Sequence, residues 1–449
     1  MRNRYSLVLA GMLLTAAGVA RAGIVEVGVV GSTTWSAIGG FNQESSNLVL
    51  FNYPGDTVTP SFNYPAWHVA VETGTTTLDV GLNSASPVAL FVNTGATLTD
   101  SFAGTTQFTR SLESPNHAID NFGIVNVTTG TLSAVTNALD SSFLNESGAT
   151  LHLSGSGNLL FDQDLDNEGT IHMDGPANSI IGGPAGSSNC CAASLENHGV
   201  INGSGNLGTN GGRMHLLFNL GTMDANGASP LGVWLDGSQE NLFGPAFLNL
   251  SGSLVQVDAG SEMDITGGTF DQTGGNTKVN GTLKSDHTLK FEAGTFGGAG
   301  TFQANVVQTG GIFDVGDPQT TTIDGNYSIT GGEILMHIDG TSAGDQDHII
   351  FNGSANLSGG AIELDIPLGV NLNGLTLSLF TFNGGETGTP NFIFTNGQNY
   401  QVTRSGDLLQ FSGNGNGAAA TPEPGEAMLL AGGLALLWMR RRCGKPPAR

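Results

Sequence analysis

Apolar and polar residues alternate along most of the chain in short runs that Gly, Asn or Pro separate. From residue 93 onwards, runs such as ATLT at 96–99, IVNV at 124–127 and TLHL at 150–153 place aliphatic residues at every second position. A period of two puts successive side chains on opposite faces of a β-strand. The pattern therefore predicts an all-β fold of many short strands, each with one apolar face.

An asparagine, followed after zero to two residues by glycine, opens these strands repeatedly. Successive copies stand 22 to 31 residues apart and begin at Asn93, Asn121, Asn145, Asn167, Asn197, Asn219, Asn249 and Asn280. Asn and Gly both tolerate positive φ, so each copy is expected to let the chain turn sharply into the next strand. Units of this length that carry one apolar strand face must stack on their neighbours to bury it.

Beyond Lys290, pairs of glycines precede the strands instead, as in Gly310-Gly311-IF and Gly331-Gly332-EILMHI. A right-handed parallel β-helix accounts for both halves, with rungs that rise about 4.8 Å each. A β-sandwich array is the alternative, but the irregular spacing and varying turn length favour rungs. We predict a β-solenoid over residues 93–412.

Residues 23–92 are less regular. SNLVLF at 46–51 and WHVAV at 67–71 alternate like strands, and Tyr-Pro pairs at 53–54 and 64–65 interrupt them. A solenoid needs a cap at its exposed end. We expect residues 23–92 to be an N-terminal β cap.

The N-terminus has the pattern of an export signal. Arg2 and Arg4 precede a largely apolar stretch, and Ala20-Arg21-Ala22 forms an Ala-x-Ala site. Residues 1–22 are therefore expected to be a signal peptide that signal peptidase cleaves after Ala22. An uncleaved N-terminal helix is the alternative.

The C-terminus has three elements in a fixed order after a linker at 413–420 (GNGNGAAA). Within residues 421–449 these are Pro422-Glu423-Pro424, an uncharged stretch at 427–439, and Arg440-Arg441-Arg442. A helix over the uncharged stretch covers about 20 Å, less than the roughly 30 Å of a hydrocarbon core. It is too short for a permanent anchor.

This order resembles the PEP-CTERM sorting signal of exported bacterial proteins. The resemblance implies transient insertion of the tail in the inner membrane and recognition by an exosortase-type sorting peptidase. The arginines would stay on the cytoplasmic side. The extra residues Cys443 to Arg449 depart from such tails, which often stop sooner.

Residues 321–412 carry a second resemblance. The order TTIDGNYSITGGEILMHIDG at 321–340 and then GGAIELDI at 359–366 looks like the closing β-strand repeats of autotransporter-like passenger domains. Those domains are β-helical secreted or surface proteins. The resemblance implies a solenoid and an exported setting, and it names no reaction.

The charge balance of the exported body is strongly acidic. Between Gly23 and Ala420, six Lys and Arg stand against 36 Asp and Glu, a formal charge of −30. Such a surface repels phosphate backbones and anionic lipids, which excludes a nucleic-acid-binding protein. The adjacent pair Cys190-Cys191 is neither a disulfide framework nor a zinc-binding spacing.

The densest acidic cluster is Asp162, Asp164 and Asp166, which alternate along one strand. They are candidate ligands for Ca²⁺, which takes six to eight oxygen atoms, although the EF-hand spacing is absent. No other cofactor is expected. Asp345 to His348 and Asp314 to Asp317 are interpreted as turn residues.

Three histidines, His152, His172 and His198, lie near the starts of successive repeat strands. His152 and His172 stand opposite the aliphatic positions, so they are expected to point outward. We expect the three to stack as an exposed polar ladder rather than as a row of metal ligands.

No nucleophile motif beside a candidate base and no phosphate-binding glycine pattern occurs in the sequence. We therefore predict an exported, acidic, non-enzymatic β-solenoid of the cell surface or extracellular matrix of a Gram-negative bacterium. Extracellular polysaccharide is the partner that the sorting-signal resemblance suggests. The alternatives are a β-helical polysaccharide lyase or hydrolase and a Ca²⁺-dependent adhesin.

Overall fold

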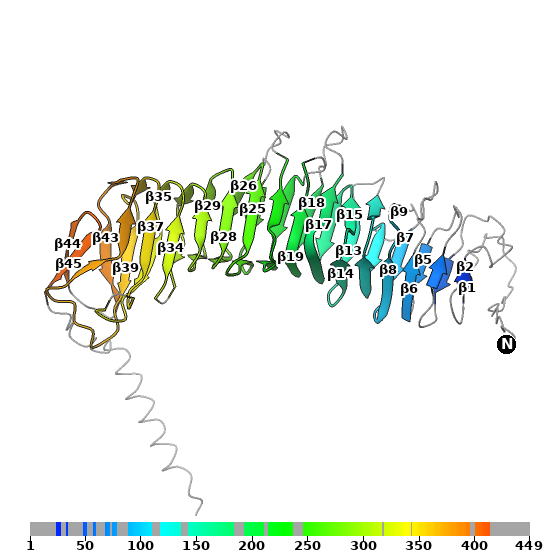
Figure 1. The fold of residues 1–449 in the computed structure, drawn as a ribbon, viewed down its shortest axis with the longest axis horizontal. Helices are drawn as coiled ribbons and strands as arrows, with labels where there is room; N and C mark the ends of the chain where they lie inside the picture. Colours follow the sequence, from blue (N-terminus) through cyan, green and yellow to red (C-terminus); the bar gives the residue numbers. More distant parts are fainter. Residues whose placement is uncertain are drawn as a thin grey trace, which may run out of the picture.

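The structure is a computed structural model. It describes residues 24–27, 33–34, 48–51, 57–59, 68–71, 74–78, 89–109, 117–135, 142–183, 193–210, 214–236, 246–316, 318–342, 344–395 and 400–413, with backbone alone before Val71. The expected signal peptide, the tail at 421–449 and nearly all of the linker lie outside these residues. Over the described ranges the chain is all-β and forms one elongated rod, with β1 near one end and β44 and β45 at the other (Figure 1).

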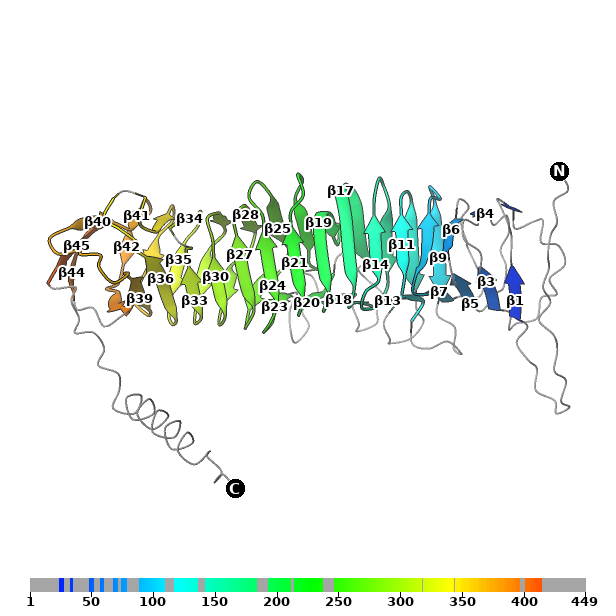
Figure 2. The same cartoon turned by 90° about the horizontal axis from the view of Figure 1, so that it is seen from below.

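The rod is a parallel β-solenoid whose strands stack in three columns along its length (Figures 1 and 2). The first column pairs one strand of each coil in parallel with the equivalent strand of the next coil. It comprises β1 (Ile24–Val27), β3 (Leu48–Phe51), β5 (His68–Val71), β7 (Ala89–Val92), β10 (Ile119–Asn121), β13 (Phe143–Asn145), β16 (Asp164–Asn167), β18 (Ser194–Asn197), β20 (Leu216–Asn219), β23 (Ala246–Asn249), β26 (Thr269–Gln272), β29 (Leu289–Phe291), β32 (Val306–Gln308), β35 (Tyr327–Ile329), β38 (Ala355–Asn356) and β42 (Glu386–Thr387).

The second column follows the first after a short turn in each coil, and its pairs are parallel too. It comprises β2 (Thr33–Thr34), β4 (Thr57–Thr59), β6 (Gly74–Leu78), β8 (Ala96–Asp100), β11 (Ile124–Val127), β14 (Thr150–Leu153), the first parts of β17 (Thr170–Gly182) and β19 (Val200–Leu207), β21 (Thr222–Ala225), β24 (Leu254–Val257), β27 (Asn276–Val279), β30 (Thr295–Gly297), β33 (Ile312–Asp314), β36 (Glu333–His337), β39 (Ala361–Asp365) and β43 (Asn391–Phe394).

The third column completes most of the coils, and β17 and β19 run through from the second column into it. Its other strands are β9 (Thr105–Thr109), β12 (Thr131–Val135), β15 (Asn158–Phe161), β22 (Leu231–Trp234), β25 (Glu262–Thr266), β28 (Thr282–Ser285), β31 (Thr301–Gln303), β34 (Thr320–Ile323), β37 (His348–Phe351) and β41 (Phe380–Phe382). The all-β solenoid predicted from the alternating pattern is confirmed, and the parallel pairing replaces the β-sandwich alternative.

The apolar core runs along the inside of the rod, because the inward positions of each strand are aliphatic or aromatic. β14 and β15 both alternate between half-exposed and buried side chains. In the C-terminal half an aromatic row fills the interior, where Phe296 stacks on Phe291 at 3.8 Å and on Phe313 at 4.7 Å between ring centroids. Each aromatic pair of this kind adds about 0.5–1.5 kcal/mol beyond the burial of its area.

Residues 23–92 were expected to be an N-terminal β cap, and their described strands lie in the same first and second columns as the strands that follow. β1, β3, β5 and β7 pair in parallel in the first column, and β4, β6 and β8 do so in the second. The third column, however, begins only with β9 in the described residues, so the described strands before residue 93 belong to the first two columns alone.

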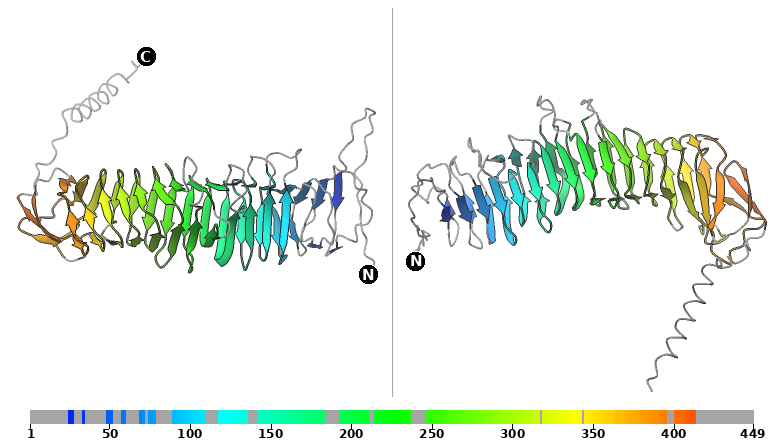
Figure 3. Two further views of the ribbon diagram at one scale, coloured as in Figure 1. Left: turned by 90° about the horizontal axis from the view of Figure 1, so that it is seen from above. Right: turned by 180° about the vertical axis from the view of Figure 1, so that it is seen from behind.

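At the C-terminal end of the rod a small antiparallel sheet closes the stack. It consists of β40 (Thr376–Ser378), β45 (Leu408–Ser412) and β44 (Gln401–Ser405), and its place at the end of the rod is visible in Figure 3. Leu409 and Phe411 are the buried residues of β45. Arg404 fixes the sheet to the last coils, since its guanidinium lies 4.6 Å from the centre of the Phe382 ring and forms an ion pair with Glu386.

Candidate functional site

Outside the core, one row of polar side chains follows the second column. Thr99, Asn126, His152, His172, Asn202, Asp224, Gln256 and Lys278 are consecutive register partners from β8 to β27. They stand at the outward positions that the strand alternation dictates, and all are partly exposed or exposed. The outward orientation predicted for His152 and His172 is confirmed.

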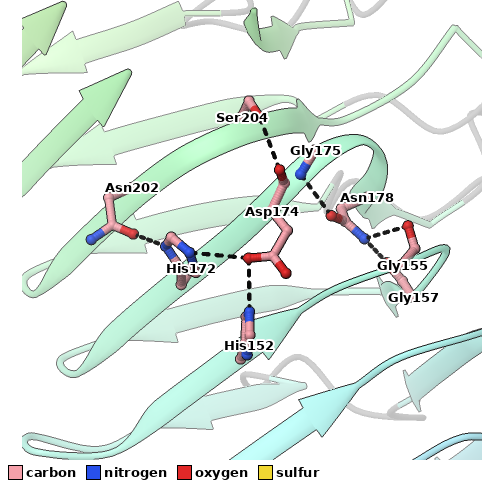
Figure 4. Close-up of polar contacts among 9 residues, drawn as sticks. All are labelled: His152, Gly155, Gly157, His172, Asp174, Gly175, Asn178, Asn202 and Ser204. Atoms are coloured by element: carbon pink, nitrogen blue, oxygen red, sulfur yellow. Dashed lines mark hydrogen bonds and ion pairs between the residues drawn. The ribbon is translucent and has the colours of Figure 1, made fainter. Parts of the chain in front are cut away.

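His152, His172 and Asp174 form a compact cluster within this region (Figure 4). Asp174 Oδ1 lies 2.9 Å from His152 Nε2 and 3.1 Å from His172 Nε2. The two imidazole rings have centroids 5.2 Å apart, since their strands are direct neighbours. Within the described part of the chain, this is the single group of three or more His, Cys, Asp or Glu residues whose ligand atoms all lie within 4.8 Å of one another.

The fold positions Asp174 through a local irregularity of β17. The pairing of β17 with β19 shifts register between Asp174 and Ser179, at the corner where the strand passes from the second to the third column. The buried Asn178 holds this corner: its Oδ1 accepts from the Gly175 amide at 3.0 Å, and its Nδ2 donates to the Gly157 carbonyl at 3.0 Å (Figure 4). Asp174 is thereby fixed on the same face as His172, two residues away.

Asn202 supports the other side of the cluster. It is the register partner of His172 on β19, and its Oδ1 is in hydrogen-bond contact with His172 Nδ1 (Figure 4). The contact fixes the plane of the His172 ring and leaves its Nε2 directed at Asp174. The side chains of His152, His172 and Asp174 are 34%, 42% and 45% exposed, so the cluster is open to solvent.

His198 is not part of this cluster, so the expected three-histidine ladder is wrong in its third member. His198 lies in the turn between β18 and β19 and pairs with Glu196 at 2.8 Å. The position in the turn explains the difference: His198 directly precedes Gly199, whereas His152 and His172 are the third residues of their strands.

The three carboxylates predicted as Ca²⁺ ligands, Asp162, Asp164 and Asp166, do not form a group whose ligand atoms all lie within 4.8 Å of one another. Asp164 and Asp166 lie at outward positions of β16, with Asp162 just before it. Asp162 accepts a hydrogen bond from the Ser142 hydroxyl at 2.7 Å, and Asp164 accepts one from the Ser194 hydroxyl. Two of these carboxylates therefore tie neighbouring coils together through serine hydroxyls.

A buried His–Asp pair was not identified from the sequence, because Asp345 to His348 were interpreted as turn residues. Asp345 does serve a turn, because it accepts from the Ser342 amide at 3.0 Å. Asp347, however, is fully buried and accepts from the backbone amides of Gln319 and His337, each at 2.7 Å, and contacts His337 Nδ1 at 2.9 Å.

Burial and the contact between the two side chains together set the pKa values of His337 and Asp347. It opposes the charge of His337, but the hydrogen bond and the charge of Asp347 outweigh it, and the pKa of His337 is raised. Burial also raises the pKa of Asp347, against the four hydrogen-bond and charge effects that lower it. The pair binds strand β36 to the start of β37 and is structural in character.

No protein-family model matches the chain, and neither does any curated protein. In the described residues there is no helix of the length and apolar character needed to cross a membrane. The predicted sorting and cleavage residues, Ala20, Ala22, Pro422, Glu423, Pro424, Arg440, Arg441 and Arg442, lie outside the described residues.

Proposed function

We propose that this chain is an exported, non-enzymatic β-solenoid of the bacterial cell surface or extracellular matrix, sorted through its C-terminal tail. The ordered tail carries the proposal: Pro422-Glu423-Pro424, the uncharged stretch at 427–439 and Arg440 to Arg442, in a chain that starts with a signal-peptide pattern. The described rod is compatible with this role, because a stack of coils presents a long outer surface without needing a catalytic centre.

The acidity of the body supports the same reading. A formal charge of −30 between Gly23 and Ala420 keeps such a rod soluble and apart from anionic lipid surfaces. Signal peptidase and an exosortase-type peptidase would be its processing partners, with the tail transiently in the inner membrane. Extracellular polysaccharide would be its neighbour at the final location.

The test is intact-mass analysis of the mature protein from a bacterium that has an exosortase-type system. Replacing Pro422, Glu423 and Pro424 together by alanine should abolish tail removal and retain the chain at the inner membrane. The matched control replaces Asn414 and Asn416 of the linker by alanine and should be processed normally. An unchanged mature mass and location in the triple variant would remove the sorting part of the proposal.

The same sample tests the start of the mature chain and the absence of catalysis. The mass should place the mature N-terminus at Gly23, after the Ala-x-Ala site. Incubation with acidic and neutral polysaccharides should release neither unsaturated nor reducing ends. Release of either would make the polysaccharide-active enzyme the better reading.

A further inference from the structure

We propose that His152, His172 and Asp174 form a binding site for a borderline divalent metal ion, with Zn²⁺ as the best fit. The inference concerns the described body of the rod and does not depend on how the chain is sorted. It rests on three features: the convergence of the ligand atoms, the hydrogen bonding of His172, and the open position of the cluster.

The ligand atoms already point at a common position. Nε2 of His152 and Nε2 of His172 lie 2.9 and 3.1 Å from the same oxygen, Asp174 Oδ1. Ligand bonds of about 2.0–2.2 Å to a tetrahedral Zn²⁺ place neighbouring ligand atoms about 3.3 Å apart. The two contacts to Asp174 Oδ1 are therefore within a few tenths of an ångström of the spacing in such a site, and all three ligand atoms lie within 4.8 Å of one another.

The hydrogen bonding of His172 leaves a place for a cation. With the Asn202 amide as placed, Nδ1–H of His172 donates to Asn202 Oδ1. A neutral imidazole has one N–H, so Nε2 then holds a lone pair that faces the Asp174 carboxylate. A metal ion between Nε2 and Oδ1 would be bound by both atoms.

Asn202 is a positioning residue for this site. Metal-bound histidines commonly donate their second ring N–H to an oxygen that fixes the tautomer and the ring orientation. Asn202 Oδ1 provides that acceptor from the next coil. Asp174 is held in turn by the corner that Asn178 closes.

The donor set selects the class of metal. Two imidazole nitrogens and one carboxylate suit Zn²⁺, and also Co²⁺, Ni²⁺ or Cu²⁺, whereas Ca²⁺ and Mg²⁺ require oxygen ligands. Three protein ligands leave a fourth position, and it faces solvent because the three side chains are 34% to 45% exposed. Water, or an oxygen atom of a bound molecule, would fill that position.

The test is calorimetric titration of Zn²⁺ into the full-length protein, purified without a polyhistidine tag and first stripped with chelator. Millimolar Ca²⁺ in the buffer keeps the many exposed carboxylates from contributing. We expect one Zn²⁺ to bind each chain. His152→Gln and His172→Gln should each lower the affinity at least tenfold, and Asp174→Asn should do the same. Asn202→Ala should lower it about tenfold, as loss of such a supporting residue does elsewhere.

His198→Gln is the matched control. His198 forms a pair with Glu196 at 2.8 Å that is as exposed as the cluster, but no third ligand joins it within the described residues. Its loss should leave the Zn²⁺ affinity unchanged. The metal-free variants should melt like the wild type, because the replaced side chains point outward.

Two results would overturn the proposal. One is the absence of saturable Zn²⁺ binding below millimolar concentration, which would mean that hydrogen bonds alone hold the three side chains together. The other is equal Zn²⁺ affinity in the wild type, His152→Gln and His172→Gln, which would place the bound ion elsewhere.

Discussion

At the scale of single residues, Asp100 at the end of β8 shows most clearly how burial disfavours the charged form of a carboxylate. Its side chain is fully buried, and the Phe102 amide donates to its Oδ1 at 3.1 Å. Burial raises the pKa of Asp100 from 3.8 to about 6, against the hydrogen bonds that lower it. The folded protein therefore holds a proton on Asp100 at pH values where the unfolded chain has lost it.

This predicts that the Asp100 contribution to stability falls as the pH rises from about 4 to about 6, and stays low above that. The folded state binds more protons in this window, so the free energy of unfolding decreases with pH, by about 3 kcal/mol in total. The amide in the Asp100→Asn variant does not titrate. Between pH 4 and pH 7 the free energy of unfolding of this variant should therefore rise by about this amount relative to that of the wild type.

Urea unfolding of both proteins across this pH range measures the difference. Glu168→Gln removes a carboxylate from an exposed position and is the control for the loss of a negative charge outside the core. A constant difference between Asp100→Asn and the wild type would show that Asp100 keeps an ordinary pKa.

At the scale of elements, the turns between the first and second columns need glycine for two separate reasons. In the longer turn before β14, Gly148 has φ +84° and open space where a Cβ would lie. In the shorter turn before β17, Gly169 is not among the glycines with positive φ, but a Cβ there would lie 2.4 Å from the Ala149 carbonyl oxygen. The sequence-based explanation by positive φ is thus right for Gly148 and wrong for Gly169.

We predict that Gly169→Ala destabilises the rod more than Gly148→Ala. Left-handed backbone costs a non-glycine residue about 1–2 kcal/mol. A Cβ in contact with the backbone of the preceding coil forces two coils apart, which we expect to cost about 3 kcal/mol or more. Thermal melting of both variants measures the order, and equal losses would contradict the close-approach role of Gly169.

The sequence predicted the positions of the strands better than the contacts between side chains of neighbouring coils. Period-two alternation identified strands such as 150–153, and the Gly-Gly pairs do precede β33 and β36. The sequence could not predict which residues of neighbouring coils lie side by side, because that depends on the register between coils. Coil length varies from 17 residues, between Leu289 and Val306, to 32, between Thr222 and Leu254. For that reason the meeting of His172 with Asn202, and of Asp347 with His337, was not visible from spacing.

At the scale of the whole molecule, the recurring asparagines form a ladder inside the rod. Asn121, Asn145, Asn167, Asn197, Asn219 and Asn249 are fully buried, and each ends its strand of the first column. Each Nδ2 donates to the amide oxygen of the next residue in the series at 2.7 to 3.1 Å, and Gln272 accepts the last of these bonds. The predicted turn-forming role of these residues is therefore incomplete, and Asn93 and Asn280 lie outside the series.

The ladder ends where the second half of the rod begins. After Gln272 the register position is taken by Phe291, whose ring stacks on Phe296, and the coils there are the shortest. The change from Asn-Gly to Gly-Gly turns beyond Lys290 thus marks a real change in the interior. The asparagine ladder joins coils of the first half. In the second half aromatic rings pack between coils, and the buried Gln308 still accepts a hydrogen bond from the Tyr327 hydroxyl.

A break in the middle of the ladder should therefore divide the rod. In a solenoid each coil contacts only its neighbours, so stability is a sum of coil and interface contributions. Asn167→Ala removes the donor to Asn197 Oδ1 and to the Val200 carbonyl, and the acceptor for Asn145 Nδ2. Buried groups left without partners cost about 1–3 kcal/mol each, and here they lie at the two interfaces that the coil of Asn167 makes with its neighbours.

We expect Asn167→Ala to lower the free energy of unfolding by about 3 kcal/mol and to make unfolding less cooperative. Urea unfolding followed by tryptophan fluorescence and by far-ultraviolet circular dichroism should give coincident transitions for the wild type and separate ones for the variant. Asn126→Ala, one coil before Asn145 on the outer face, is the control and should behave as the wild type. Coincident transitions in Asn167→Ala, with stability unchanged, would mean that the aliphatic core alone holds neighbouring coils together.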